Sequence, residues 1–509
     1  MAVKGSKQKN VQPIKMVLNG GLNYAQTPAN LEDNELRRAH NFIYDPSTDF
    51  LITRPGTTCV TTLAAKFPDP ILAVYYYEKS GTAKWLVCAS GGNLYYLNVN
   101  VWVFIGALHD STTVPSFLTF NTSLLIADGG TNIKKWTGSV YSSIATSPNA
   151  SVLTTIGNRV VANHVGEPDS VYLSKTKDET DWNTSGSAVG VKAGYGDNMT
   201  VNAFGVFKDD LLVFKKGDSE KAIYRLNVAD ATTTNWYVAM VSFNNCAQNS
   251  QAATSAWNNV FFVDTNGFKS IKGVDTYGDL EIDSIGRKIN TVFTSGTNCD
   301  FMTYIPLYNT IWFGMGDRMF CYTERGTTNS SGDATTVPAF TDILFQQGRI
   351  RGVCQAGDSV YLAGHNGYLY LIDETYATDE TVIGTKENYV SVIRTKTFVF
   401  GGDGVLKKLQ LYLRPKVAGT ANLYVYKDEQ TNVNMQTIAL PGIGEVLYDA
   451  TGYLYSATEE LYGAGAAAWV QNSRSRVRNP QMAFELYCLS GRVGVEWMRA
   501  EVAMLEGGE

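Results

Sequence analysis

Charged side chains are scarce in this chain of 509 residues: Asp, Glu, Lys and Arg make up 18% of it, against roughly 25% in an ordinary soluble domain. The 42 basic and 48 acidic residues leave a formal net charge of −6. Proteins that hold nucleic acid through a broad basic face have the opposite balance. We therefore expect no such face here.

Hydrophobic runs are short. The longest, residues 71–77 and 101–108, have the length of strands, whereas a membrane-spanning helix needs about 18 apolar residues. The first ten residues, MAVKGSKQKN, contain no apolar segment of the kind found in secretory leaders. The sequence therefore predicts neither membrane insertion nor Sec export.

Residues that bind metals or form cross-links are few and scattered. The four histidines form no recognisable ligand cluster, the seven cysteines form no C-x-x-C pair, and H-E-x-x-H is absent. We expect no zinc site, and thiols that stay reduced in a cytosol. The phosphate-binding pattern G-x-x-x-x-G-K-[ST] is also missing. No metal or cofactor is predicted.

One short loop contains the residue types of a hydrolytic triad, namely His164, Glu167, Asp169 and Ser170. A serine nucleophile is normally held on a strained strand-to-helix turn, and the sequence has no such turn here. A polar hairpin loop explains these residues better, and we predict that the protein is not an enzyme.

Aromatic residues and glycine are abundant, with 9 Trp, 29 Tyr, 22 Phe and 47 Gly. This composition is typical of short strands joined by tight turns, so the fold is predicted to be all-β.

An apolar run recurs between about residue 67 and residue 375, and most instances follow Asn or Asp. The runs are residues 85–89, 124–127, 160–162, 211–214, 260–263, 311–313 and 360–363. A period of roughly 40 to 50 residues matches the blade of a β-propeller. We predict about seven blades, although the uneven spacing also allows six or eight. A pair of β-sandwiches is the competing interpretation.

The N-terminal segment, residues 1–60, differs from the repeat. Residues 1–15 are polar and basic and are predicted to form a loose arm, and Met16–Leu18 a short strand. Acidic residues then precede Leu36, Ala39 and Ile43, whose spacings of three and four predict a short helix.

The repeat stops near residue 380, and longer strands with alternating polarity follow, as in Leu409–Leu413 and Ala421–Tyr426. Alternating polarity indicates that one face of each strand is buried and the other is exposed to solvent, as in a β-sandwich or jelly roll. The sequence therefore predicts three units: an N-terminal segment (1–60), a propeller (61–380) and a C-terminal sandwich (381–509).

The densest basic segment contains Arg474, Arg476 and Arg478, whose alternation would place the three guanidinium groups on one face of a strand. This face is either a subunit interface that binds carboxylates of a neighbour or a solvated surface.

Three ordered groups of residues carry a more specific signal. The first comprises Leu18-Asn-Gly20-Gly21-Leu22-Asn23, Pro28, Leu31-x-Asp33-Asn34-Glu35, Ala39-x-Asn41 and Arg54-Pro55-Gly56. The second comprises Asn158-Arg159, Pro168, Val171-Tyr-Leu-Ser174, Asp178 and Asp181-Trp182, and the third Ser250, Trp257–Asp264 and Gly267. In order and spacing, these groups resemble the tail nozzle, or packaged-DNA stabilisation, proteins of short-tailed (podovirus-type) bacteriophages.

This resemblance implies a structural virion protein of the phage tail, made in the host bacterial cytoplasm. Six copies would form a ring below the portal and its adaptor, in contact with tail fibre or tail needle proteins. The ring would retain packaged double-stranded DNA and later form its exit conduit, without sequence-specific binding. Such a conduit should have few cationic side chains, because each contact with a phosphate helps to retain the DNA. No catalytic residue is carried over.

Two other functions are compatible with a propeller. A glycan- or receptor-binding protein would use exposed aromatic residues, for which Trp182 and Trp236-Tyr237 are candidates. A glycosidase would need two carboxylates at a defined separation, and the sequence offers no such pair.

Overall fold

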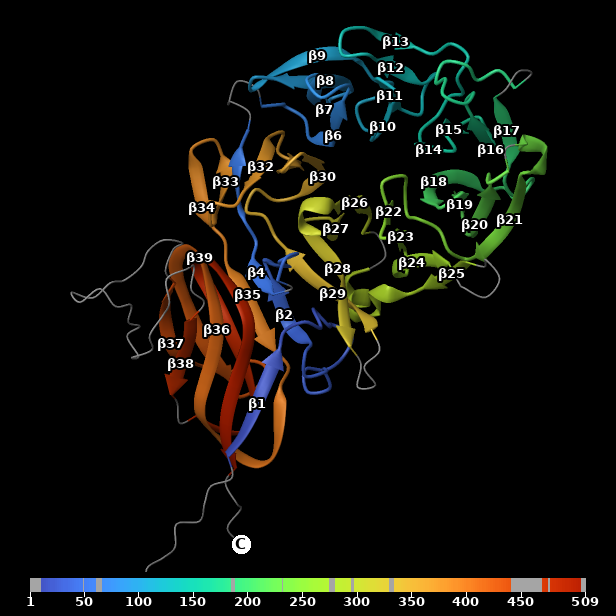
Figure 1. Ribbon diagram of the computed structural model, residues 1–509. Coiled ribbons are helices and arrows are strands. Elements are labelled where there is room, and N and C mark those ends of the chain that lie inside the picture. The colour runs from blue at the N-terminus through green and yellow to red at the C-terminus, as the bar shows by residue number, and fades with distance from the viewer. Residues whose placement is uncertain are drawn as a thin grey trace, which may run out of the picture.

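The computed structural model describes residues 11–48, 50–60, 66–184, 188–230, 232–273, 280–293, 297–328, 334–440, 469–474 and 477–504. Figure 1 shows a ring of small sheets with a layered β-domain beside it. Helical structure in the described residues consists of short 3-10 segments, such as η2 (Thr233–Asn235), η3 (Ile285–Val292) and η4 (Pro306–Tyr308). The predicted all-β class is therefore confirmed.

Seven four-stranded units form the ring, which confirms the prediction of a propeller with about seven blades. Blade 1 is β6 (Ile71–Glu78), β7 (Lys84–Ser90), β8 (Asn93–Asn98) and β9 (Val101–Ala107); blade 2 is β10 (Ser116–Phe120), β11 (Ser123–Ala127), β12 (Lys134–Trp136) and β13 (Tyr141–Ser143). Blade 3 is β14 (Leu153–Ile156), β15 (Arg159–His164), β16 (Glu167–Leu173) and β17 (Val189–Lys192); blade 4 is β18 (Thr200–Phe207), β19 (Asp210–Lys216), β20 (Lys221–Asn227) and β21 (Tyr237–Phe243). Blade 5 is β22 (Ala253–Ala256), β23 (Asn259–Asp264), β24 (Gly267–Gly273) and β25 (Leu280–Asp283); blade 6 is β26 (Cys299–Ile305), β27 (Thr310–Met315), β28 (Arg318–Thr328) and β29 (Ala334–Ile343). Blade 7 begins with β30 (Ile350–Ala356), β31 (Ser359–Gly364) and β32 (Leu369–Asp373).

The fourth strand of blade 7 comes from the N-terminal side of blade 1. It is β5 (Gly56–Cys59), which pairs with β32 in the register Gly56 to Asp373 and Cys59 to Tyr370. The ring is thus closed by hydrogen bonds between distant parts of the chain. Two further strands, β33 (Thr378–Val382) and β34 (Thr385–Asn388), extend this sheet beyond β5.

Each apolar run of the sequence repeat forms the second strand of its blade, from β7 to β31. These strands are buried because neighbouring blades cover both of their faces. The side chains of Val87, Leu125, Val161, Leu212 and Phe262, for example, are fully buried. The first strand of each blade lines the centre of the ring instead.

The C-terminal domain is the predicted β-sandwich. Two long strands, β36 (Phe398–Tyr426) and β39 (Arg478–Met504), pair along most of their length. Shorter strands of the C-terminal part pair with them: β35 (Ser391–Thr395) beside β39, and β37 (Asn432–Leu440) and β38 (Trp469–Arg474) beside different parts of β36. Alternate side chains from both halves of β36 fill one core, from Leu409 to Val425. The long strands must therefore bend between the two layers.

Two glycines allow close approach at this bend. A Cβ atom on Gly419 would lie 2.2 Å from the carbonyl oxygen of Ser490. Gly491 has a φ of +77°, which L-residues rarely adopt.

The N-terminal segment belongs to both domains. In the sandwich, β1 (Val11–Val17) and β4 (Leu51–Thr53) pair with β39, and β3 (Phe42–Tyr44) pairs with β4. The strand β2 (Leu36–His40) pairs with β35 of the sandwich and makes one parallel bridge to β29 of blade 6. The domain boundaries that the sequence predicts after residues 60 and 380 stay predictions. The N-terminal segment, however, pairs with both domains and does not form a separate unit.

Two local predictions were wrong. Residues 11–15 do not form a loose arm, because they lie in β1. Leu36, Ala39 and Ile43 do not form a helix but lie in β2 and β3. A register shift between Leu36 and Arg38 lets Leu36 and Ala39 reach the same core. A bulge thus produces the spacing of three that resembles a helix in the sequence.

A glycine substitution in the closing strand tests ring closure. A Cβ atom on Gly56 would lie 2.2 Å from the carbonyl oxygen of Thr378, whereas nothing lies within 4 Å of a Cβ atom on Gly81. We expect Gly56→Ala to lower the free energy of unfolding by about 2 kcal/mol or more. Gly81→Ala should change it by less than about 0.5 kcal/mol. Chemical denaturation measures both, and equal effects would contradict the structural role of β5.

Candidate functional site: the central cavity and the propeller–sandwich junction

A cavity of about 680 Å³ occupies the centre of the propeller. All seven first strands or the residues beside them line it, including Tyr75, Phe117, Thr254, Thr303 and Arg351. Pockets of this volume are typical of small-molecule sites.

The second region of interest is the junction between propeller and sandwich. The side chains of Arg54 and Asp379 are 2% and 0% exposed there and form an ion pair of 2.6 Å between Nη2 and Oδ2. Nη1 of Arg54 donates a second bond of 2.8 Å to Oδ1, so the pair is bidentate. The guanidinium also lies between the rings of Phe345 and Tyr389. Arg54, which lies between β4 of the sandwich and β5 of blade 7, is therefore bound to β33, the strand beside β5 in the propeller sheet.

Asn41 connects three segments beside this ion pair. Its Oδ1 accepts bonds from Nε of Arg54 and the backbone N–H of Leu344, both at 3.0 Å. Its Nδ2 donates to the carbonyl oxygen of Val390 at 2.7 Å. The backbone has a φ of 56°, which asparagine tolerates better than most residues.

A buried carboxylate, Asp342, occupies the bridge between β2 and β29. It accepts bonds of 2.9 Å from His40 and from Arg318. Burial alone would raise the pKa of Asp342, but the hydrogen bond and charge of His40, together with Arg318, outweigh it and hold the pKa below its usual value.

The remaining N-terminal motif residues lie in the same region. A Cβ atom on Gly20 would lie 2.8 Å from the carbonyl oxygen of Asn34, and one on Gly21, whose φ is +68°, 2.5 Å from the backbone nitrogen of Phe340. Asn23 donates to Glu35, which forms an ion pair of 3.0 Å with Lys288 in η3, between blades 5 and 6.

Two prolines complete this set. The carbonyl oxygen of Pro28 accepts a bond of 2.9 Å from the N–H of Thr397, just before β36. The carbonyl oxygen of Pro55 accepts a bond of 2.9 Å from Nη1 of Arg54. The structure thus brings together the motif residues from Gly20 to Gly56 at one junction.

Sequence reasoning missed Arg492 and Glu374. The side chain of Arg492 in β39 is 1% exposed, and its Nη2 lies 2.6 Å from Oε2 of Glu374, which follows β32. Its Nε also donates to the carbonyl oxygen of Thr53. An isolated Arg and an isolated Glu, separated by 118 residues, form no recognisable sequence pattern.

The second motif group lies in blade 3 and is structural. Nη1 of Arg159 donates to the carbonyl oxygen of Ser174 at 2.6 Å, and Oγ of Ser174 accepts from the N–H of Val160. Trp182 is buried in an apolar cluster and donates from Nε1 to the carbonyl oxygen of Glu179. These contacts fix the loop after β16.

The loop that resembles a triad has no activated nucleophile. Oγ of Ser170 donates to Glu167 at 2.6 Å, and Nζ of Lys192 donates to both side chains. The bonds from Ser170 and Lys192 lower the pKa of Glu167 to about 2, and the bond to Glu167 raises the pKa of Lys192. Lys192 therefore stays protonated and cannot serve as a base for Ser170.

Within the described residues, no group of three or more His, Cys, Asp or Glu side chains could hold a metal ion. The cysteines are free, and burial raises the pKa of Cys59, Cys246 and Cys488 to about 12. Such thiols are poor nucleophiles at neutral pH.

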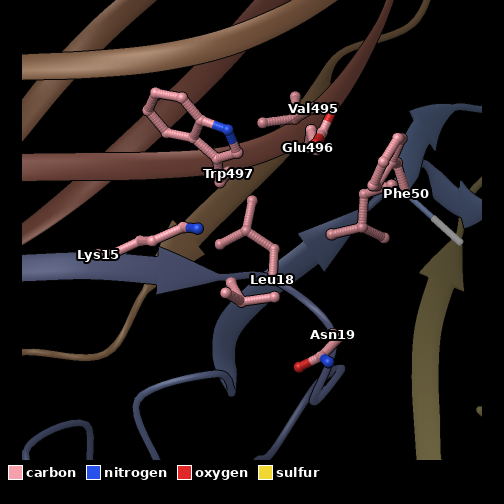
Figure 2. Close-up of a pocket in the computed structure, with 9 residues that line it drawn as sticks. Lys15, Leu18, Asn19, Phe50, Val495, Glu496 and Trp497 are labelled. Atoms are coloured by element: carbon pink, nitrogen blue, oxygen red, sulfur yellow. The ribbon is translucent and has the colours of Figure 1, made fainter. Parts of the chain in front are cut away.

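A smaller cavity of about 150 Å³ lies in the sandwich between β1, β4 and β39. Figure 2 shows Lys15, Leu18, Phe50 and Trp497 around it. Trp497 also stacks on Tyr412 with ring centroids 5.7 Å apart. The volume corresponds to one side chain rather than to a substrate.

The basic segment is described in part. Arg474 ends β38, where its backbone pairs with Lys408, and Arg476 lies outside the described residues. Arg478 is exposed and forms an ion pair with Asp403. Its role as a subunit interface stays a prediction.

The aromatic residues suggested as glycan platforms have different surroundings. Trp182 is buried and cannot stack on a sugar. Trp236 packs against Arg159 and donates from Nε1 to the carbonyl oxygen of Asp230. Tyr237 is exposed beside Arg225.

Comparison with known proteins identifies no family: no family model matches the chain, and no curated protein matches it. Several solved structures are similar at low identity. BamB from Moraxella catarrhalis is 11% identical, with 65% of this chain and 92% of that chain covered and a TM-score of 0.36. The β-propeller domain of Cps50 (Swd1) from Myceliophteria thermophila is 9% identical, with 60% and 97% covered and a TM-score of 0.38. The N-terminal domain of Nup159 is 11% identical, with 66% and 98% covered and a TM-score of 0.37.

These values are too low to carry a functional argument. The propeller assignment depends on the seven blades and their closure by β5. None of the described helical segments has the length and hydropathy of a membrane-spanning helix.

The junction ion pair can be tested by removing one partner. Arg54→Met would leave the buried carboxylate of Asp379 without its cation, so we expect the free energy of unfolding to fall by about 3 kcal/mol or more. Arg478→Met is the matched control, because Arg478 is 61% exposed in its ion pair, and should cost less than about 1 kcal/mol. Similar losses in urea denaturation would contradict the role given to Arg54.

A second test uses acid. Because the pKa of Asp342 is lower in the folded protein than in the unfolded chain, its contribution is present above about pH 4 and is lost as the pH falls through the folded-state pKa. We expect Asp342→Asn to reduce the loss of stability on acidification, as measured by urea denaturation from pH 6 to pH 2. Asp218→Asn, at an exposed position, should leave the acid profile unchanged. Parallel profiles for all three proteins would contradict the assignment.

Proposed function

We propose that this chain is a structural virion protein, a subunit of the tail nozzle of a short-tailed bacteriophage. Six copies would extend the portal–adaptor channel, retain the packaged DNA and form its ejection conduit. The main support is that the motif residues on which the resemblance depends, from Gly20 to Gly56, lie at the junction between propeller and sandwich. These motif residues thus specify a joint between domains rather than a catalytic centre.

The junction suits a mechanical role. A subunit that retains DNA transmits force between neighbouring rings, and relative motion of its domains would weaken the seal. Breaking a buried, bidentate ion pair such as Arg54–Asp379 costs several kcal/mol because both charges lose their partner. Arg492–Glu374 adds a second connection between sandwich and propeller.

The conduit would lie between copies of the chain. The central cavity of one propeller has a ligand-sized volume of about 680 Å³, so duplex DNA would pass along the axis of the ring of subunits. The low charge of the chain fits this role, since few phosphate contacts would oppose sliding.

Exposed apolar side chains offer contact surfaces for such a ring. Val101 and Phe104 lie on β9 of blade 1, and Tyr237, Met240 and Phe243 lie on β21 of blade 4. Both are the fourth strands of their blades and face outward. Aromatic and Met side chains are enriched in protein interfaces. Portal-adaptor and tail fibre or needle proteins would be further partners.

Electron microscopy of the purified protein, alone and mixed with its adaptor ring, tests the proposal. Six-fold rings with a channel wide enough for duplex DNA are the expected result. Monomers that never form rings with the adaptor, and that instead bind a glycan array, would favour the alternative of a glycan- or receptor-binding propeller.

Charge reversal tests the basic segment within that assembly. Changing Arg474, Arg476 and Arg478 to Glu should reduce the fraction of rings if this strand contacts a neighbouring subunit. Lys208→Glu, at an exposed propeller position, is the control. An unchanged oligomer size in light scattering would show that the segment is not part of the interface.

A further inference from the structure

We propose that the central cavity of the propeller binds a small organic anion, with the guanidinium of Arg351 as the group that binds its carboxylate or phosphate. This inference depends on the propeller and its cavity and is independent of the proposed role in a phage tail. Three observations support it: the charge of the lining, the distribution of its polar groups, and its volume.

Among the described residues that line the cavity, Arg351 is the one with a charged side chain. A cavity wall with a single positive charge and no negative one favours an anionic ligand over a cationic one. Arginine also presents a planar fork of N–H groups that matches carboxylates and phosphates.

The acidic residue nearest to Arg351 shares its carboxylate between two arginines. Asp300 of blade 6 is bound by Arg349, whose Nε and Nη2 donate to its two carboxylate oxygens at 2.7 and 2.5 Å. Arg351 is the second cation on the same carboxylate, with Nη1 3.2 Å from Oδ1. Two guanidinium groups therefore share the carboxylate of Asp300, while the charge of Asp317 acts on Arg349 as well. Within the described residues, Nε of Arg351 also has no hydrogen-bond acceptor.

Polar groups gather on the same side of the cavity. Blades 5 and 6 contribute Gln251, Thr254 and Thr303, and Arg351 belongs to blade 7, the next in the ring. The strands β22, β26 and β30 that carry or adjoin these residues contact one another in order. Amide and hydroxyl donors beside a guanidinium are suited to bind the remaining oxygens of an oxyanion.

The other side of the cavity combines aromatic and aliphatic side chains with the hydroxyl-bearing residues Ser116 and Thr154. Blades 1, 2 and 4 contribute Tyr75, Tyr76, Phe117 and Phe204, together with aliphatic side chains. A cavity with one polar and one aromatic side fits a ligand that has an anionic group and an apolar body. A volume of about 680 Å³ lies within the range of small-molecule sites, roughly 300 to 1,000 Å³.

Four probes of similar shape and different charge test this site by calorimetry and saturation-transfer NMR on the full chain. Benzoate and phenyl phosphate are expected to bind with one site per chain and a dissociation constant of about 1 mM or below. Benzyl alcohol, which lacks the charge, should bind about 10- to 100-fold more weakly. Benzylammonium should show no binding. The two anions also distinguish a carboxylate ligand from a phosphate ligand.

Four variants locate the site. Arg351→Gln should weaken the binding of both anions about 10- to 100-fold. Arg351→Lys should weaken it less, because the positive charge remains. Arg478→Gln is the control at an exposed ion pair and should leave binding unchanged. If Arg351→Gln lowers the melting temperature, weaker binding by this variant could come from lost stability. Thr254→Trp then tests the site, because the tryptophan fills part of the cavity and leaves the Arg351–Asp300 pair in place.

Loss of binding in Thr254→Trp with an unchanged melting temperature would support the site. The proposal is overturned if neither anion binds, if benzyl alcohol binds as tightly as benzoate, or if binding survives both Arg351→Gln and Thr254→Trp. Ring formation in electron microscopy is a separate measurement, so failure of one proposal does not decide the other.

Discussion

Ring closure between β5 and β32 is the interaction on which the rest of this structure depends. A propeller gains its stability when the last blade covers the first, and here the strand that completes blade 7 precedes blade 1 in the chain. Arg54 lies two residues before this strand and binds Asp379 in a buried, bidentate pair. The same short segment continues backward into β4, which pairs with β39 of the sandwich. Closure of the propeller and attachment of the sandwich are therefore coupled through a few consecutive residues.

The small number of charged residues is used at contacts between blades and between domains. Lys215 of blade 4 is fully buried and bonds to Asp169 of blade 3 and to Asp197. Lys221 of blade 4 and Lys269 of blade 5 both bind Asp264. Buried pairs of this kind contribute little net stability compared with apolar packing, but a wrong register would leave a charge unpaired. Such pairs suit a fold in which seven similar blades must meet in one order.

The central cavity and the junction separate two possible roles of the molecule. The Arg54–Asp379 pair at the junction is satisfied, since the carboxylate of Asp379 accepts from Arg54, Thr57 and the N–H of Gln346, whereas Oδ1 of the nearby Asp342 has no hydrogen-bond donor among the described residues. Arg351 in the cavity, by contrast, shares its one carboxylate with Arg349. Satisfied buried networks hold domains in place, whereas a partly satisfied cation beside an open volume is available to a ligand. This difference makes the junction the centre of the mechanical proposal and the cavity the centre of the binding proposal.

The sequence by itself predicted the all-β class, a propeller of about seven blades with six or eight left open, and the sandwich, because blade cores and alternating strands leave local patterns of apolar residues. It also identified Arg54, Asn41 and Gly21 as special, although it could not tell what they contact. The tertiary structure decided what local patterns cannot encode. The bulge in β2 looked like a helix because a strand with one extra residue has helical spacing. The partners Asp379 and Glu374 lie 325 and 118 residues from Arg54 and Arg492, and the sharing of Asp300 between two arginines arises when neighbouring blades meet. Pairing across such distances depends on ring closure, which no local window of the sequence contains.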